Sequence, residues 1–504
     1  MRIGVDFGTT RTTIACVDRG NYPMVSFEDE SGDLHDYIPS VAALDGNHLV
    51  FGHEAERLAS DGAAHLRSFK RLLADAGVTP STTVRLARRD IGLVDLLTRF
   101  LAHVAQLVRE SSSVATVPAD EPLEAVVGVP AHAHSGQRFL TMEAFRAAGW
   151  NVLSMVNEPS AAGFEYTHRH SGTLNSRRTK VLVYDLGGGT FDASLVVADG
   201  VDHEVLASRG NNLLGGDDFD LVLARLALRS AGLSPADLGD EGWDTLVHQC
   251  RLVKESLTPQ SRFATIDVQG SPVILPVRDY YEEVRPLVDS TLETMTPLLD
   301  LDAQGASKLA ADVAGLYVVG GGAELPAVAR ILRDAHGRRV HRSPHPAAST
   351  AIGLAIAADP AAAYTLRDTL SRGVGVFREA ESGDLVSFDP LLEPDLVLAR
   401  GEDVHVVRRY RAAHNVGWFR FVEYSRTDSD GVPRGDVIPC GEVFMPFDRQ
   451  LQGAQVDLSR VEVVRTEDGP LVEERYTVDR NGIVTVEIVD VETGWSVGRN
   501  LGKL

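Results

Sequence analysis

The sequence predicts a duplicated α/β fold with two facing halves, followed by an all-β domain. One observation is a repeated design: residues 3–10 form a short apolar run that ends in an Asp and a Gly-Thr-Thr turn, and residues 181–190 do the same with a glycine-rich turn. The other is a change of pattern along the chain. Strand, turn and helix signals alternate through about residue 358, whereas short alternating runs separated by turn residues follow residue 372.

In both repeated turns a strand brings a carboxylate, Asp6 or Asp185, to its C-terminal end. The glycines that follow allow backbone N–H groups to approach an anion without interference from a Cβ atom. A single Gly-Gly-Gly-Thr sequence is more often an ordinary turn. Two turns of the same design instead predict a polyphosphate between the halves and Mg²⁺ near the two Asp residues.

The individual elements follow from periodicity and from residues that begin or end helices. Residues 2–18 alternate as a β-hairpin that turns at positions 8–11, and the β-branched run at 126–130 predicts a buried strand. A helix is expected at 135–148, closed by Gly149, and a further helix opens at 157–159 with Pro159 at its start. The remaining expectations are strands at 152–156, 192–199, 203–209 and 316–319, and helices at 217–232, 241–257 and from about 326.

The composition changes near residue 359, which divides the chain into units at 1–358 and 372–504 with a linker at 359–371. The last unit has strand-like runs at 395–398, 404–407 and 483–489, and turn residues lie between them. This pattern predicts a β-sandwich. The pair Asn481-Gly482 between two such runs is typical of a tight type I′ hairpin turn.

The bulk composition restricts the function. The 504 residues are 44% hydrophobic and carry a net charge of −22, which argues against general binding to nucleic acid or to anionic membranes. There is no apolar run of about 18 residues and no signal segment at the N-terminus. Three scattered cysteines, Cys16, Cys250 and Cys440, are too few for a disulfide framework. A cytoplasmic protein is therefore expected.

Seven motifs, in order along residues 1–358, resemble the ATPase domain of the seventy-kilodalton heat-shock chaperones (DnaK-like), a member of the actin and sugar-kinase superfold. They lie at 4–10, 69–73, 128–131, 157–162, 185–192, 214–220 and 319–321. The resemblance implies an actin-like ATPase of two lobes with duplicated ribonuclease-H-like halves. Residues 368–375 and 479–486 are similar to the linker and a late hairpin of the family's substrate domain, here without its helical lid.

The site residues combine chemical reasoning with the resemblance. Asp6 and Asp185 suit Mg²⁺ held through its waters, and Lys70 has the charge and reach to contact a transferring phosphoryl group. Glu158, Asp192 or Thr190 could orient the attacking water, and the family's catalytic residues match Lys70, Glu158, Asp192 and Thr190 together with the two Mg²⁺ carboxylates. The expected nucleotide contacts are Gly8, Thr9, Thr10, Gly187, Gly188, Gly189, Gly215, Gly216, Lys254, Thr258, Gly320, Gly321 and Glu324. Pro130 and Arg138 match the family's relay to the substrate domain.

Several positions depart from the family pattern. Glu324 stands where the family has an Arg beside the adenine, Arg251 where it has Glu, and Ala347 where it has an acidic residue. An Arg251–Glu324 pair would rebuild the pocket with inverted polarity if the two side chains meet. Otherwise we expect the affinity for the base to be reduced more than the binding and hydrolysis of the phosphates. The linker has also lost its run of leucines, so weak coupling between the domains is expected.

The resemblance implies ATP or ADP as cofactor with Mg²⁺, and K⁺ as a further candidate ion. It implies an ATP-dependent chaperone that slowly hydrolyses ATP and binds extended polypeptide in its β-domain, with a J-domain-type co-chaperone and a nucleotide-exchange factor as partners. The alternative is an actin-like ATPase switch dedicated to one partner, and a small-molecule kinase is a third, less favoured class. An apolar groove on the β-domain would favour the chaperone; a charged or closed one would favour the dedicated switch.

Overall fold

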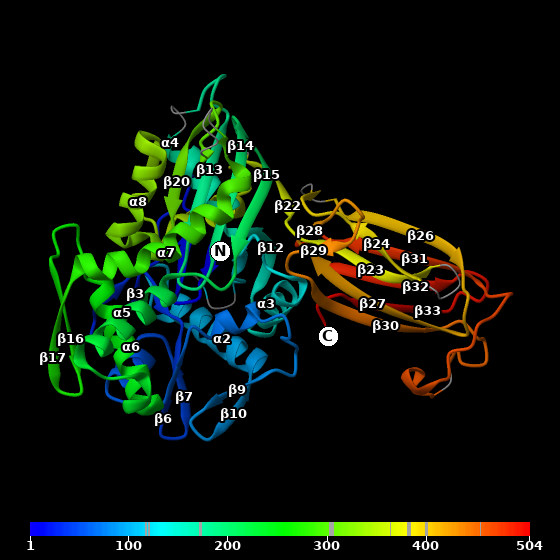
Figure 1. Cartoon of the computed structure of the whole chain (residues 1–504), viewed down its shortest axis with the longest axis horizontal. Coiled ribbons are helices and arrows are strands. Elements are labelled where there is room, and N and C mark those ends of the chain that lie inside the picture. Colours follow the sequence, from blue (N-terminus) through cyan, green and yellow to red (C-terminus); the bar gives the residue numbers. More distant parts are fainter. Residues whose placement is uncertain are drawn as a thin grey trace.

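The computed structural model describes residues 1–115, 118, 121–170, 174–301, 307–362, 364–380, 385–398, 402–453 and 455–503. An α/β part (blue to green) lies beside a β-rich domain (yellow to red), as Figure 1 shows. No helix in these residues is long and apolar enough to cross a membrane. The three cysteines are buried free thiols.

The first lobe is built on a five-stranded sheet in the order β12-β11-β1-β2-β5. The expected hairpin is present as β1 (Arg2–Phe7) and β2 (Arg11–Cys16), and β1 runs parallel to β11 (Glu124–Val129), which pairs in turn with β12 (Asn151–Asn157). The apolar faces of α2 (Leu93–Glu110) and α3 (Ser135–Ala147) complete its core. The lobe also contains α1 (Gly52–Ser60), a 3₁₀ helix (Phe69–Ala74) and the strands β3 (Phe27–Glu28), β4 (Leu34–His35), β5 (Ile38–Pro39), β6 (Val41–Asp45), β7 (His48–Phe51), β8 (His65–Arg67), β9 (Thr83–Leu86) and β10 (Arg89–Gly92).

The second lobe repeats this plan in a sheet ordered β21-β20-β13-β14-β15-β22-β25. β13 (Lys180–Leu186) and β14 (Phe191–Asp199) form the hairpin, and β13 pairs in parallel with β20 (Val313–Val319). The duplication predicted from the two turns is therefore confirmed. The other elements are β15 (Asp202–Asn211), α5 (Gly216–Ala231), α6 (Gly239–Glu255), β16 (Phe263–Val268), β17 (Ser271–Pro276), α7 (Val277–Met295), β18 (Asp300–Leu301), β19 (Ser307–Lys308), α8 (Pro326–His336) and β21 (Val340–Arg342).

Two helices join the lobes at the base of the cleft. α4 (Glu158–His170) packs on α9 (Ser349–Ala358), and α9 also packs on β1 while α4 packs on β13 and β14. The contact is made at backbone distance: a Cβ atom on Gly353 would lie 1.8 Å from the Ala161 carbonyl oxygen. This close packing fixes how the two sheets, and the turns at their strand ends, face each other.

The linker is not a free connector. Its residues form β22 (Thr365–Leu370), which pairs in parallel with β15 and antiparallel with β25 (Leu396–Leu398). The loss of the leucines therefore does not prevent the linker from joining the sheet of the second lobe, because main-chain hydrogen bonds supply the pairing.

The C-terminal domain consists of two four-stranded antiparallel sheets around one apolar core, as the alternating pattern predicts. One sheet contains β24 (Leu385–Leu392), β23 (Gly373–Ala380), β27 (Val416–Tyr424) and β30 (Ile438–Pro446); the other contains β26 (Val404–Arg411), β31 (Leu471–Val478), β32 (Val484–Asp490) and β33 (Ser496–Asn500). A short pair, β28 (Arg426–Thr427) and β29 (Pro433–Arg434), extends from it.

The turn at 480–482 is not type I′, which requires a positive φ at both central residues. Gly482 has φ +72°, but Asn481 is not among the residues with positive φ. The Gly482 N–H instead donates to the Asp479 carbonyl, and the Asp479 N–H donates to the Ile483 carbonyl, so the loop is one residue longer than predicted. The Asn481 side chain is used elsewhere, at the boundary with the first lobe.

Candidate functional site

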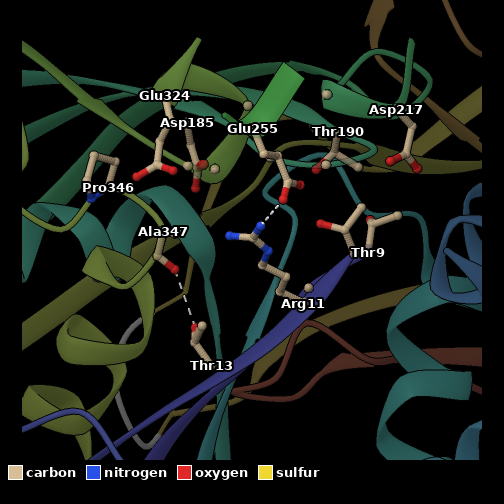
Figure 2. Close-up of a pocket in the computed structure, with 18 of the residues that line it drawn as sticks. Thr9, Arg11, Thr13, Asp185, Thr190, Asp217, Glu255, Glu324, Pro346 and Ala347 are labelled. Carbon is tan, nitrogen blue, oxygen red and sulfur yellow. Dashed lines mark hydrogen bonds and ion pairs between the residues drawn. The ribbon is translucent and has the colours of Figure 1, made fainter. Parts of the chain in front are cut away.

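A cavity between the two lobes collects most of the predicted site residues. Those that line it are Asp6, Gly8, Thr9, Thr10, Lys70, Glu158, Asp185, Gly187, Gly188, Thr190, Gly216, Lys254, Gly320, Gly321 and Glu324. They come from strand ends, turns and helix ends of both lobes. Figure 2 shows Thr9 and Arg11 facing Asp185, Thr190 and Glu255 across this cavity.

The backbone of the second glycine turn packs directly on the threonine side chains of the first. A Cβ on Gly188 would lie 2.5 Å from the Thr10 side chain, and one on Gly189 would lie 2.8 Å from that of Thr9. Gly320, with φ +87°, places its turn against Asp185, where a Cβ would lie 2.5 Å from the carboxylate. Such turns present backbone N–H groups to an anion, as the sequence predicts.

Lys70 is placed by the 3₁₀ helix and is almost fully buried, with 3% of its surface exposed. Its ammonium donates to the Glu158 carboxylate at 3.2 Å and lies 5.3 Å from the centre of the Phe7 ring. Glu158 is the first residue of α4, directly after β12. A buried lysine held this way keeps its remaining donors for a phosphoryl group in the cavity.

The carboxylates of the cavity repel one another. Burial and then the charge of Glu158 raise the pKa of Asp6 to about 7, although Lys70 opposes the shift. Burial, followed by Glu158, Asp6 and Asp192, raises the pKa of Asp185 well above its usual value. This excess of negative charge favours a bound cation.

Among the described residues, no group of three His, Cys, Asp or Glu side chains is arranged to hold a metal directly. Mg²⁺, however, usually keeps several waters and needs only one or two carboxylates. Asp6 and Asp185 therefore fit a magnesium ion held through its waters between the phosphate turns.

Asp192 does not line the cavity but lies next to it. It stands opposite Asp185 in the β13–β14 register and is 1% exposed. One of its carboxylate oxygens accepts a hydrogen bond from the backbone N–H of His132 at 3.2 Å. Burial and then Glu158 raise its pKa well above the usual value. Gly189 and Gly215 likewise lie behind the lining, where a Cβ on Gly215 would lie 2.5 Å from the Gly188 carbonyl oxygen.

Two of the predicted nucleotide contacts, Lys254 and Thr258, differ in position. Lys254 lines the cavity, donates to the Gly216 carbonyl at 2.8 Å and forms an ion pair with Asp220, whose carboxylate lies 2.6 Å away. Thr258 is exposed, is not a lining residue, and receives a hydrogen bond from Ser261 or donates one to it. The structure therefore places Leu257, not Thr258, at the cavity wall.

The inverted pair of Arg251 and Glu324 is not formed, although both residues line the cavity. Arg251 donates to Glu255, one helical turn further on, at 3.0 Å, and Glu324 lies 3.9 Å from Arg342. Ala347 lies at the wall, where its carbonyl accepts from Thr13 (Figure 2).

Sequence reasoning missed several lining residues, chiefly Arg11 and Glu255. Arg11 directly follows the Gly-Thr-Thr turn, and Glu255 lies four positions after Arg251 on the same helix. Each of these charged residues lies next to a motif that the sequence analysis recognised, and this proximity could have identified both as candidate lining residues.

The predicted relay residues lie at the boundary with the β-domain. Pro130 is buried directly after β11. Arg138 on α3 is buried and donates to the Asn157 side chain at 2.6 Å and to the Asn481 carbonyl of the β-domain at 3.4 Å. The Asn481 side chain accepts in turn from the backbone N–H of Met155 at 3.0 Å.

The linker and the β-domain contact the same segment of the first lobe. Asp368 accepts from the backbone and side-chain amides of Asn157, at 3.2 and 2.8 Å, and from Ser160 at 3.1 Å. Arg372 donates to the ring of His132 at 3.3 Å, the residue whose backbone binds Asp192. The two α/β lobes and the β-domain are thus joined through buried polar groups.

Comparison with known proteins gives consistent matches. The model of the family described as Hsp70 protein matches residues 98–368. Proteins named chaperone protein HscA homolog are similar to this chain: that of Burkholderia ambifaria (strain MC40-6) is 34% identical over 380 residues, and that of Burkholderia lata is 34% identical over 381. Each match covers 71% of this chain and 58% of the relative, so the chain spans less than two thirds of these relatives.

The crowding of carboxylates predicts a pH-dependent stability. With a pKa of about 7 in the folded chain and 3.8 as its usual value, Asp6 binds more protons when folded, so its contribution to stability falls as the pH rises between these values. Without divalent cations near pH 8, we expect Asp6→Asn to be more stable than the wild type by about 1 kcal/mol or more, roughly one pKa unit. Near pH 4 the gain should vanish.

Urea unfolding at the two pH values measures this difference. The exposed residue Asp45 provides the control, because Asp45→Asn removes a carboxylate outside the cavity. Equal stability of Asp6→Asn and wild type at both pH values would contradict the inferred repulsion.

Proposed function

The chain belongs to the Hsp70 family, and we propose that it binds ATP with Mg²⁺ in the interlobe cavity, hydrolyses it slowly, and uses the nucleotide state to regulate polypeptide binding by its β-domain. The observation that carries this proposal is the pair of facing Gly-Thr turns with the buried Lys70–Glu158 pair between them. A cytoplasmic location and partners such as a J-domain-type co-chaperone and a nucleotide-exchange factor are part of the same proposal.

Hydrolysis of a γ-phosphoryl group depends mainly on positioning and on neutralising charge. Thr9, Thr10 and the 187–190 turn would hold the phosphates, and Lys70 would contact the transferring group. Glu158 keeps the Lys70 ammonium aimed into the cavity. A Mg²⁺ ion near Asp6 and Asp185 would neutralise the phosphate oxygens and relieve the repulsion between the carboxylates.

The attacking water would be oriented by Thr190, with Glu158 able to accept its proton, since both residues line the cavity; Asp192, directly behind the wall, is the further candidate for this role. The raised pKa of Asp192 supports this role, because burial and neighbouring charge make its carboxylate a stronger base than an ordinary aspartate. Its hydrogen bond to the backbone of His132 fixes its orientation.

Coupling between the domains is supported by the contacts of the linker. Asp368 on β22 binds the backbone N–H and the side chain of Asn157, and Asn157 is followed by Glu158. Glu423 of the β-domain accepts from the backbone N–H of Ser135 at 2.8 Å, and Arg372, 3% exposed, lies 3.4 Å from Glu423. Movement of either contact would be transmitted to residues beside the catalytic groups.

One feature of the β-domain favours the alternative, a switch dedicated to one partner. Between the sheets, the fully buried carboxylate of Glu474 accepts hydrogen bonds from the two terminal nitrogens of Arg378, at 2.9 and 2.7 Å. It also accepts hydrogen bonds from the hydroxyls of Tyr410 and Tyr476. A general chaperone would need an apolar groove, and this buried ionic cluster beside the apolar core does not provide one.

A surface cavity of the same domain has a similar character. Its wall includes apolar residues such as Val407 and Phe444 beside the charged residues Glu442, Arg475, Glu487, Arg499 and Lys503. A wall of this kind suits a partner with matching charges better than many unrelated apolar peptides. Capture of one protein rather than many by a hydrolysis-blocked variant would favour the dedicated switch.

The ATPase proposal predicts that Lys70→Ala and Thr190→Ala each lower ATP turnover on the order of 100- to 1,000-fold while binding remains measurable. The loss arises because each side chain stabilises the transferring phosphoryl group or the water. Turnover by phosphate release and binding by calorimetry test this. Lys308→Ala, at an exposed position, is the control. Normal turnover of Lys70→Ala, or no ATP binding by the wild type, would refute the proposal.

Base selectivity should be low because Glu324 replaces the arginine that the family places beside adenine. Restoring the cation with Glu324→Arg should strengthen ATP binding about 2- to 30-fold, since a cation–π contact contributes roughly 0.5–2 kcal/mol. Discrimination against GTP should rise with it. Competition binding of ATP and GTP measures both, with Glu293→Arg on the exposed face of α7 as the charge-matched control. Strong exclusion of GTP by the wild type would disprove this expectation.

Linker docking should depend on Asp368. Asp368→Ala removes the acceptor for Asn157 and Ser160, and a hydrogen bond to a charged group contributes about 1.5–3 kcal/mol. We expect hydrogen-exchange protection of β22 with ATP bound to fall at least about tenfold, the equivalent of 1.4 kcal/mol. Asp403→Ala, at an exposed site, is the control. Unchanged protection in Asp368→Ala would show that these contacts do not hold the linker.

A further inference from the structure

One ion pair crosses the cavity from lobe to lobe. Arg11, on β2 of the first lobe, donates to Glu255 at the end of α6 in the second lobe at 2.5 Å, and both residues line the cavity. Figure 2 shows the Arg11 side chain reaching toward Glu255, with this contact as a dashed line.

Both partners are held in place by neighbours. The Arg11 guanidinium lies 4.4 Å from the centre of the Tyr37 ring, a cation–π contact that directs it across the cleft. Arg251, whose side chain is only 7% exposed, donates to the other oxygen of Glu255 at 3.0 Å. Burial opposes the ionisation of Glu255, but Arg11 and Arg251 lower its pKa below the usual value. The side chains of Arg11 and Glu255 remain 22% and 33% exposed, so the order of this bridge comes from the contacts with Tyr37 and Arg251 and not from burial.

The bridge connects the two lobes, which must move apart for a bound nucleotide to leave. Thr9 and Thr10 line the cavity from the first lobe and Gly187, Gly188 and Thr190 line it from the second, so in the proposed complex the phosphates would be contacted from both sides. A ligand gripped from both sides leaves only when the lobes move apart, and that movement pulls Arg11 away from Glu255. A second interlobe pair, Arg71–Asp218 at 3.0 Å, would still resist opening if the first were lost.

We propose that the Arg11–Glu255 bridge is a latch across the nucleotide cavity that slows nucleotide release, with Arg251 and Tyr37 as its positioning residues. This inference rests on the proposed ATP binding and adds a determinant of release to it. Because one further interlobe pair remains, removal of the latch should raise the release rate about 3- to 10-fold.

The test uses the full chain loaded with a fluorescent ADP, chased with excess unlabelled ADP in a stopped-flow instrument. Arg11→Gln and Glu255→Gln should each release the probe about 3- to 10-fold faster, and the double variant should be no faster than either single one, because both lose the same bridge. Rising salt should speed release from the wild type and have little effect on the variants. Arg229→Gln, which breaks an ion pair with Glu283 inside the second lobe, is the control.

The sign of the Glu255→Gln effect is decisive. If Arg11 instead served as a phosphate ligand restrained by Glu255, freeing it would slow release, and this result would overturn the latch. Wild-type release rates in both single variants, or additive effects in the double variant, would also overturn it while leaving the ATPase proposal intact. Failure of the wild type to bind the probe would overturn both.

Discussion

The contact between the two glycine turns is the constraint on which the site depends. Gly188 and Gly189 sit against Thr10 and Thr9 so closely that any side chain would push the lobes apart. That spacing brings Asp6 and Asp185 near enough to repel each other and leaves Lys70 as the buried cation beside Glu158. The charge imbalance of the cavity therefore depends on this close contact between the glycine backbone of one turn and the threonine side chains of the other.

The parts of the molecule that local sequence determines were predictable. The hairpins of both lobes follow from alternation, the start of α4 from Pro159, and the cavity from motifs in which a strand end, an Asp and glycines are neighbours in the chain. Lys70 and Glu158 are far apart in the sequence, and their common place in the cavity wall could be predicted only from the resemblance to a family.

Sequence reasoning could not foresee where a helix ends or which of several possible partners a side chain meets. Thr258 seemed equivalent to Lys254, but helix α6 ends at Glu255 and the chain turns away from the cavity. Arg251 prefers Glu255 over Glu324 because a neighbour one helical turn away is always within reach. Asn481 was assigned to a turn type by its neighbour alone, whereas its side chain bonds to Met155, 326 residues earlier.

The pairing of β22 determines which surface of the second lobe would be exposed if the domains separated. In the docked form β22 covers one edge of the second lobe's sheet by pairing with β15. If the linker left, the N–H and C=O groups of β15 that now face β22 would be exposed, and an open sheet edge is a ready template for pairing with another chain. The linker therefore protects the second lobe from unwanted association as well as tethering it to the β-domain. Any partner that holds the domains apart must either shield that edge or use it.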